Sequence, residues 1–514
     1  MRNVVFIGSH LGYPMDRTPL GGGGMVGLQL VRHWAGLGGA PSRGKSGDFR
    51  LTVLGSGAHD PTPERPGVSY LQLPSRPGSP DLVRLSEMGY ARFCRRFEAA
   101  TTAYLLDNPR IFEPRRTAVI VNDISESPDL DRLAGAGYRI LSIWHVDVVD
   151  FFNRLYLGGL LAPERWTRAF ARIERWGLAR CVPDVLRLVF QKQRRVVERS
   201  AVLALPSRRM AETIRRCYGG RDGGRPTERN REEVPPPDDV GGRPTERNRE
   251  EVPPPDDVGG RPTERNREEV PPPDDVGGRP LEERILIAPW GGWRESFSEE
   301  AVALEASRLR AHYHLRPGSR VVLTLSRISP EKGIHLLLEA LRRLEGSPRF
   351  RATDVCLFIC GETAFMRGES YGRRVRAAAE RLRRFRVFFP GYLAPVEKQA
   401  YFRLADLFVS PSLHESYGLT IVEAMRAGLP ILASDHYGGD EILDPSYGRT
   451  VPYGDAGLRP RLLAVGLEEM LGDPAGLRRM GRRAREASAS ARMDFAGTAR
   501  RLLDAALALI PEES

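Results

Sequence analysis

The stretch that decides the fold of this chain is His414-Glu415-Ser416-Tyr417-Gly418-Leu419-Thr420-Ile421-Val422-Glu423-Ala424-Met425. An apolar run typical of a buried strand, Leu407 to Ser410, precedes it. Its second half places Ile421, Ala424 and Met425 at helical spacing. The segment therefore predicts a strand, a tight turn and the start of a helix.

Such a turn suits a phosphate group. The backbone N–H groups of Gly418, Leu419 and Thr420 would lack partners in the first helical turn, where the helix dipole favours an anion by about 0.3 to 1 kcal/mol. Glu415 then lies before the helix and Glu423 lies inside it. One carboxylate can face a reacting centre, while the other accepts hydrogen bonds from a ribose diol.

Three further segments accompany this one, namely Leu325 to Gly333 (LSRISPEKG), Gly428 to Asp435 (GLPILASD) and Gly438 to Ile442 (GGDEI). Together with the paired glutamates, they resemble the retaining glycosyltransferases of family 4. Most of the resemblance lies between residues 321 and 455, and the N-terminal half matches more loosely.

The resemblance implies an α/β fold of the GT-B type, in which two doubly wound, Rossmann-like domains face a cleft. Apolar, strand-like runs alternate with helical patterns along both halves of the chain, as two parallel sheets require. The expected domains are residues 1–290 on the acceptor side, residues 291–490 for the nucleotide sugar, and a C-terminal helix over 491–514 that crosses back to the first domain.

The resemblance also implies a reaction. The enzyme would transfer a sugar from a nucleotide-diphosphate sugar to an acceptor hydroxyl with retention of anomeric configuration, in polysaccharide or glycoconjugate synthesis. Its expected catalytic residues are Glu415, His145, Arg327 and Lys332. The two cations follow a strand and suit a pyrophosphate, because Arg offers a bidentate fork and Lys a mobile charge. His145 ends another strand and would contact a sugar hydroxyl, with Asp147 as a weaker candidate.

The donor-binding residues implied by the resemblance form a larger set. They are Gly21, Gly22, Arg327, Lys332, Gly391, Tyr392, Leu393, Gly418, Leu419, Thr420 and Glu423. The sequence departs from the family pattern in two places. The acidic residue often found two positions after the glycine pair is missing, and Val146 separates His145 from Asp147.

The nucleotide sugar is expected to be a substrate, with no further cofactor and no metal ion. Asp129-Leu130-Asp131 fits a metal-binding pair only formally, and we expect it to start a helix. Loss of activity in EDTA and recovery with manganese would contradict this expectation.

An 18-residue segment, GGRPTERNREEVPPPDDV, occurs three times without change from Gly223 to Val276. Prolines, glycines and charges dominate it, so we expect a disordered surface insertion over residues 221–280 that arose by tandem expansion. The three copies carry −6, so the remainder of the chain carries +17 against a total of +11.

Composition indicates a large enzyme of the cytoplasm. Five scattered cysteines without a C-x-x-C pair favour a reducing compartment, and neither a signal peptide nor an 18-residue apolar run is evident. Arg165 to Arg175 predicts an amphipathic helix with Trp166, Phe170 and Ile173 on one face. Peripheral contact with the inner face of an anionic membrane and packing in the core both explain that pattern.

Other classes of protein stay open. They are a GT-B epimerase, a phosphorylase, a non-catalytic carbohydrate- or nucleotide-binding module of the same fold, and a nucleic-acid-binding protein. A phosphorylase should show a lysine context for pyridoxal phosphate, which we do not find, and basicity alone does not explain the paired glutamates. We therefore expect no nucleic-acid partner; the acceptor would be a carbohydrate, a lipid-linked sugar or a small molecule.

Overall fold

The structure is a computed structural model of the whole chain. It describes residues 1–14, 21–37, 49–62, 65–74, 82, 85–156, 162–219, 279–293, 297–350, 353–363 and 368–511. The predicted insertion at 221–280 falls almost entirely outside these ranges. Residues 1–218 and 273–514 belong to one compact unit, and both sheets described below lie within it.

The first sheet is parallel throughout, and its seven strands lie in the order β3-β2-β1-β4-β5-β6-β7 among the described residues. The strands are β1 (Arg2–Ile7), β2 (Phe49–Gly55), β3 (Val68–Gln72), β4 (Thr117–Val121), β5 (Arg139–Ile143), β6 (Val202–Leu205) and β7 (Ile285–Ile287). Because both faces of such a sheet are covered, its central strands are almost continuously apolar. The side chains of β4, for example, are all buried.

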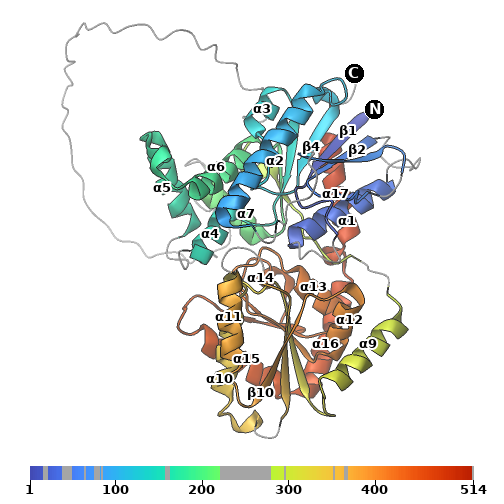
Figure 1. The fold of residues 1–514 in the computed structure, drawn as a ribbon, viewed down its shortest axis with the longest axis vertical. Coiled ribbons are helices and arrows are strands. Elements are labelled where there is room, and N and C mark those ends of the chain that lie inside the picture. Colours follow the sequence, from blue (N-terminus) through green and yellow to red (C-terminus); the bar gives the residue numbers. More distant parts are fainter. Residues whose placement is uncertain are drawn as a thin grey trace, which may run out of the picture. The chain divides into compact units, whose positions relative to one another are not determined.

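Helices cover both faces of this sheet (Figure 1). The helices of this part of the chain are α1 (Gly22–Leu37), α2 (Glu87–Asp107), α3 (Leu130–Gly135), α4 (Val148–Tyr156), α5 (Pro163–Arg175), α6 (Asp184–Arg199), α7 (Arg208–Tyr218) and α8 (Leu281–Arg284). Polar side chains cap the first turns of α2 and α3, for example. Ser86 accepts from the backbone N–H of Gly89, and Asp129 accepts from that of Arg132. The expectation that Asp129 starts a helix is thus confirmed.

The second sheet is also parallel, with six strands in the order β10-β9-β8-β11-β12-β13 in the described part of the chain. They are β8 (Arg320–Leu325), β9 (Val355–Cys360), β10 (Phe385–Gly391), β11 (Leu407–Ser410), β12 (Ile431–Ser434) and β13 (Gly448–Val451). The helices are α9 (Glu299–His312), α10 (Ile334–Leu344), α11 (Gly368–Ala379), α12 (Pro395–Leu404), α13 (Leu419–Arg426), α14 (Gly439–Ile442), α15 (Arg459–Leu471) and α16 (Pro474–Ser488).

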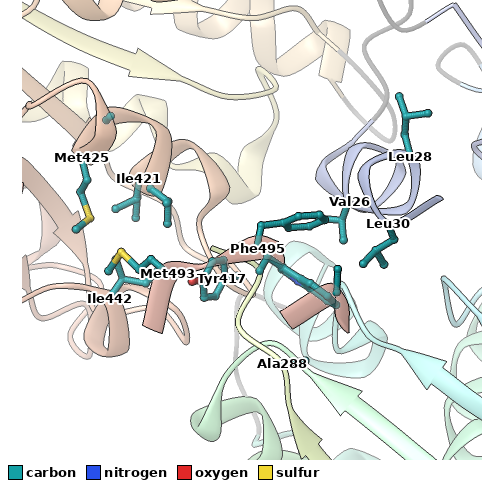
Figure 2. Close-up of a cluster of buried hydrophobic side chains, with 14 of the residues drawn as sticks. Val26, Leu28, Leu30, Ala288, Tyr417, Ile421, Met425, Ile442, Met493 and Phe495 are labelled. Carbon is teal, nitrogen blue, oxygen red and sulfur yellow. The ribbon is translucent and has the colours of Figure 1, made fainter. Parts of the chain in front are cut away.

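The last helix, α17 (Phe495–Ala508), packs against α1 and the first sheet rather than the second. The indole Nε1 of Trp34 on α1 donates to the backbone oxygen of Ala499 at 2.7 Å. Figure 2 shows the hydrophobic cluster around this crossing, where Phe495 and Met493 lie near Tyr417. The same cluster includes Val26 of α1 and Ile421 of α13, so one core joins the two sheets.

Both sheets have a point at which the strand order reverses. In the first sheet β1 pairs with both β2 and β4, and in the second β8 pairs with both β9 and β11. In doubly wound sheets, ligands bind outside the carboxyl ends of the strands at such a reversal. Two doubly wound domains were predicted from the sequence, and the fold confirms them.

Among the helices that the structure describes, none has the length and the apolar character that a membrane span requires.

Candidate functional site

A cavity of about 830 Å³ opens at the carboxyl ends of β1, β4, β8 and β11, and residues of both sheets line it. It brings together nearly all the residues predicted as a site. Those that line it are Gly21, Gly22, His145, Arg327, Lys332, Tyr392, Leu393, Glu415, Gly418, Leu419, Thr420 and Glu423. Gly391 does not line the cavity; its backbone oxygen accepts from the N–H of Gly361 at 2.7 Å.

The predicted strand, turn and helix around Gly418 are confirmed. β11 ends at Ser410, and α13 begins at Leu419 directly after Gly418, whose φ is 99°. A Cβ at Gly418 would lie 2.9 Å from Cδ1 of Ile421, so both the backbone angle and the space favour glycine. The first N–H groups of α13 lie at the cavity, where they can bind an anion.

Glu415 and Lys332 form an ion pair on the cavity wall. Nζ of Lys332 lies 2.5 Å from Oε2 of Glu415, and both side chains are largely buried. Burial works against the charge of Glu415, but Lys332 and then His436 outweigh it and hold the pKa of Glu415 below its ordinary value. The carboxylate therefore stays ionised near neutral pH and can accept hydrogen bonds from a ligand.

Arg327 follows β8 and lies beside a buried carboxylate. Its guanidinium is 3.5 Å from Oε1 of Glu331, which also accepts from the hydroxyl of Ser329 at 2.5 Å. The backbone oxygen of Glu331 accepts from the N–H of Leu413, in the loop after β11. Glu331 thus links the loop after β8 to the loop after β11 and orients Arg327. The sequence motif did not predict this role.

Glu423 lies one helical turn inside α13 and is paired with a cation. Nζ of Lys398, on α12, is 2.9 Å from Oε1 of Glu423. Both residues line the cavity. The carboxylate thus lies at the cavity, where its oxygens could accept hydrogen bonds from a ribose diol.

His145 follows β5 and lies at the carboxyl edge of the first sheet. Its Nε2 is 3.1 Å from Oδ1 of Asn122, and its ring lies 5.2 Å from that of Trp290. Burial lowers the pKa of His145 to about 3, so the ring stays neutral. With Nε2 donating to Asn122, Nδ1 is left as an acceptor for a hydroxyl.

Asp147, the weaker candidate, does not reach the cavity. It is fully buried, and Oδ1 accepts from the backbone N–H groups of Val149 and Asp150 at 3.1 and 3.2 Å. Nε2 of Gln193 donates to the same oxygen at 2.9 Å. Asp147 therefore caps the first turn of α4 and fixes the segment that follows His145.

The glycine run lies within α1 rather than in a loop before it, because the helix begins at Gly22. A Cβ at Gly23 would lie 2.9 Å from Cδ2 of His145, and the side-chain amide of Asn122 donates to the backbone oxygen of Gly23 at 3.2 Å. The helix can approach β4 and β5 this closely only because Gly23 lacks a side chain.

Three polar residues of the first domain were missed by the sequence motifs. His10 follows β1, and Asp123 and Glu126 follow β4. His10 and Asp123 line the cavity. Burial and then the neighbouring Glu126 raise the pKa of Asp123 to about 7. The only sequence signal was a polar residue just beyond each strand.

The apolar face of α5 is largely used within the protein. Phe170 stacks on Phe190 of α6 at a centroid distance of 4.7 Å, and the indole of Trp166 donates to the side chain of Asn153 at 3.1 Å. Of the two explanations for this helix, core packing accounts for its aromatic side chains. Its arginines are exposed, and Trp176 just beyond it is 70% exposed.

Comparison with known proteins finds a family match for the part of the chain that forms the second sheet. Residues 306–487 match the family model of the glycosyl transferases group 1. The matched segment contains Arg327, Lys332, Glu415 and Glu423, all of which line the cavity. The first domain lies outside the segment that matches group 1.

A curated relative is the alpha-monoglucosyldiacylglycerol synthase of Streptococcus pneumoniae, which is 30% identical over 158 residues. That match covers 30% of this chain and 33% of the relative. The chain thus spans about a third of the length of such curated relatives.

Solved structures resemble nearly the whole chain. Sucrose-phosphate synthase from Thermosynechococcus elongatus matches with a TM-score of 0.60 and 17% identity, over 98% of this chain and 97% of that one. HepE from Anabaena, solved with UDP and glucose, matches with a TM-score of 0.53 and 14% identity, over 98% and 99%. The fold is therefore of the GT-B type.

Proposed function

We propose that this protein is a retaining glycosyltransferase of family 4, which transfers a sugar from a nucleotide-diphosphate sugar to an acceptor hydroxyl. One observation carries the proposal. Arg327, Lys332 and the N-terminus of α13 face the same cavity as Glu415 and Glu423, so cations, N–H donors and acceptor carboxylates surround one space.

This arrangement suits the two halves of a nucleotide-diphosphate sugar. The pyrophosphate would lie against Arg327, Lys332 and the N–H groups of Leu419 and Thr420, and the ribose diol would donate to Glu423. The base would lie near Tyr392 and Leu393, with the backbone of Gly391 behind them. HepE, which shares the fold, is known in complex with UDP and glucose, and UDP is therefore the first nucleotide to test.

The proposed chemistry occurs on one face of the sugar. The bond between C1 and the pyrophosphate oxygen breaks, and the acceptor oxygen bonds to C1 from the same side. The acceptor proton passes to the departing phosphate oxygen, so no enzymic nucleophile is needed. Arg327 and Lys332 stabilise the charge that develops on this phosphate, while Glu415 and His145 orient the hydroxyls of the sugar.

Calorimetric binding of UDP, GDP, ADP and their sugar conjugates tests the donor site. We expect selective binding of one nucleotide by the wild type and loss of that binding in Glu423→Ala. Glu369→Ala is the matched control, because Glu369 is an exposed carboxylate outside the cavity. If none of the nucleotides bound, the non-catalytic module of the same fold would become the better hypothesis.

Two measurements test the finer parts of the proposal. With the donor identified, the anomeric configuration of the product, read by NMR, should equal that of the donor sugar; inversion would contradict retention. Nucleotide affinity should be the same in EDTA and in manganese, since Arg327 and Lys332 neutralise the pyrophosphate. A requirement for manganese in nucleotide binding would show this assignment to be wrong.

We propose a cytoplasmic enzyme with a carbohydrate, lipid-linked or small-molecule acceptor that acts in polysaccharide or glycoconjugate synthesis. The relative from Streptococcus pneumoniae is by name a glycolipid synthase, which favours contact with an anionic membrane. The surface proposed for this contact consists of the exposed Arg168, Arg172 and Arg175 of α5 together with Trp176. Pelleting with vesicles of anionic lipid at low salt tests it, and a chain that stayed in the supernatant would contradict it.

A further inference from the structure

Three side chains that the proposed transfer does not use meet at the carboxyl edge of the first sheet. His10 lies in the loop after β1, and Asp123 and Glu126 lie in the loop after β4. Because β1 and β4 are adjacent parallel strands, their following loops meet at the same edge. One ligand atom from each residue lies within 4.8 Å of the other two.

The separation of the closest pair suits a metal ion. Nε2 of His10 is 3.2 Å from Oε1 of Glu126. Two ligands that each lie roughly 2.1 Å from one metal ion, at tetrahedral or octahedral angles, are about 3.0 to 3.4 Å apart. The remaining carboxylate, that of Asp123, is close enough to complete a set of three ligands.

Glu126 supplies a second, independent observation. The residue is 2% exposed, and Oε1 contacts His10 and accepts from the hydroxyl of Tyr90. Its other oxygen, Oε2, is buried and has no hydrogen-bond partner among the described residues. A buried carboxylate oxygen without a partner is costly. The cluster thus holds two carboxylates and an unused acceptor, with His10 as its one basic member.

We propose that His10, Asp123 and Glu126 bind a divalent cation, with Zn²⁺ or Mn²⁺ as the ions that best fit one imidazole and two carboxylates. The cation would offset the paired carboxylates and satisfy Oε2 of Glu126. His10 and Asp123 line the cavity, so the open coordination positions of the cation face it. Water or a hydroxyl group of a ligand could occupy those positions.

None of the three proposed ligands is among the residues assigned to the donor, although His10 and Asp123 line the same cavity. Arg327, Lys332 and Glu415 belong to the second sheet, whereas all three proposed ligands belong to the first. Metal binding at these three residues therefore does not require sugar transfer, and it can be measured with the metal ion alone.

The test is calorimetric titration of Mn²⁺ and Zn²⁺ into the full chain after EDTA treatment and dialysis, with Mn²⁺ binding repeated by electron paramagnetic resonance. We expect one strong site per chain in the wild type and at least tenfold weaker binding in Asp123→Asn and in Glu126→Gln. Asp107→Asn, which changes an exposed carboxylate at the end of α2, should bind as the wild type does.

The shift in unfolding temperature on addition of the metal ion provides a second readout, which also works for a variant of lower stability. Zn²⁺ or Mn²⁺ should raise the unfolding temperature of the wild type and of Asp107→Asn, but not that of Asp123→Asn or His10→Gln. The proposal is overturned if the stripped wild type binds neither ion, or if Asp123→Asn and Asp107→Asn bind them equally well.

Discussion

The smallest unit of the site is the buried pair of Lys332 and Glu415. The two opposite charges offset the cost of burying each other, because a lone charge there would be poorly solvated. The pair also leaves acceptor and donor groups for a ligand. We therefore expect the proposed activity to depend on the pair rather than on either residue alone.

Lys332→Ala should lower kcat/KM for the proposed transfer by on the order of 100-fold, since it removes a cation at the developing charge and leaves Glu415 unpaired. Steady-state kinetics with the donor identified by calorimetry checks this. Arg342→Ala on the exposed side of α10 is the control and should change little. Unaltered activity in Lys332→Ala would remove Lys332 from the site.

His436 offers a prediction about pH at the same scale. Burial lowers its pKa to about 4, and Nδ1 accepts from the backbone N–H of Gly439 at 3.0 Å. Between about pH 6.5 and pH 4, His436 is therefore mostly neutral in the folded state but mostly protonated in the unfolded state. This contribution makes the folded protein lose stability as the pH falls from about 6.5 toward 4.

In His436→Asn this loss should be absent. The stability advantage of the wild type over the variant should therefore shrink by about 2 kcal/mol between pH 7 and pH 4.5. Urea unfolding at the two pH values measures that difference. A constant difference would mean that His436 titrates alike in the folded and unfolded states.

At the scale of elements, the strands were the most predictable part of the fold. Runs such as Val355 to Cys360 are apolar throughout, and the structure buries every residue of that strand. β13 is harder to predict, because Gly448-Arg449-Thr450-Val451 has a single large apolar residue and lies at the sheet edge. Short edge strands carry little pattern of their own.

The candidate site was predictable only where a motif marked it. Glu415 and Arg327 belong to recognisable segments, and both line the cavity. His10 and Asp123 are single polar residues after two strands that lie far apart in the sequence. Only the pairing of β1 with β4 brings them together, and that pairing is a property of the tertiary fold.

The turn before α13 gives a prediction for an element. Gly418→Ala should destabilise the protein by about 1 to 3 kcal/mol and weaken nucleotide binding, because alanine is strained at φ 99° and its Cβ would press on Ile421. Gly135→Ala, at the end of α3, is the matched control, since no atom lies within 4 Å of its Cβ position. Thermal unfolding and calorimetry measure both effects. Equal behaviour of the two variants would contradict the role of this turn.

At the scale of the whole molecule, one carboxylate joins the first sheet domain to the loop that carries Glu415. Asp150 on α4 accepts from the hydroxyl of Tyr437 and the guanidinium of Arg154, each at 2.8 Å. Nδ1 of His414 lies 3.4 Å from the same oxygen, and Arg154 also donates to the backbone oxygen of Leu413. The His414 loop is therefore positioned by the opposite domain.

Asp150→Asn should cost about 1.5 to 3 kcal/mol of stability, because the hydrogen bonds that the buried carboxylate accepts from Arg154 and Tyr437 weaken together. It should also lower kcat of the proposed transfer, although Asp150 does not line the cavity. Asp131→Asn breaks ion pairs of similar geometry that are 39% exposed, and it should cost under about 1 kcal/mol. Chemical unfolding and kinetics on both variants measure these effects. If Asp150→Asn lost stability but kept full kcat, the carboxylate would hold the two domains together without positioning the catalytic loop.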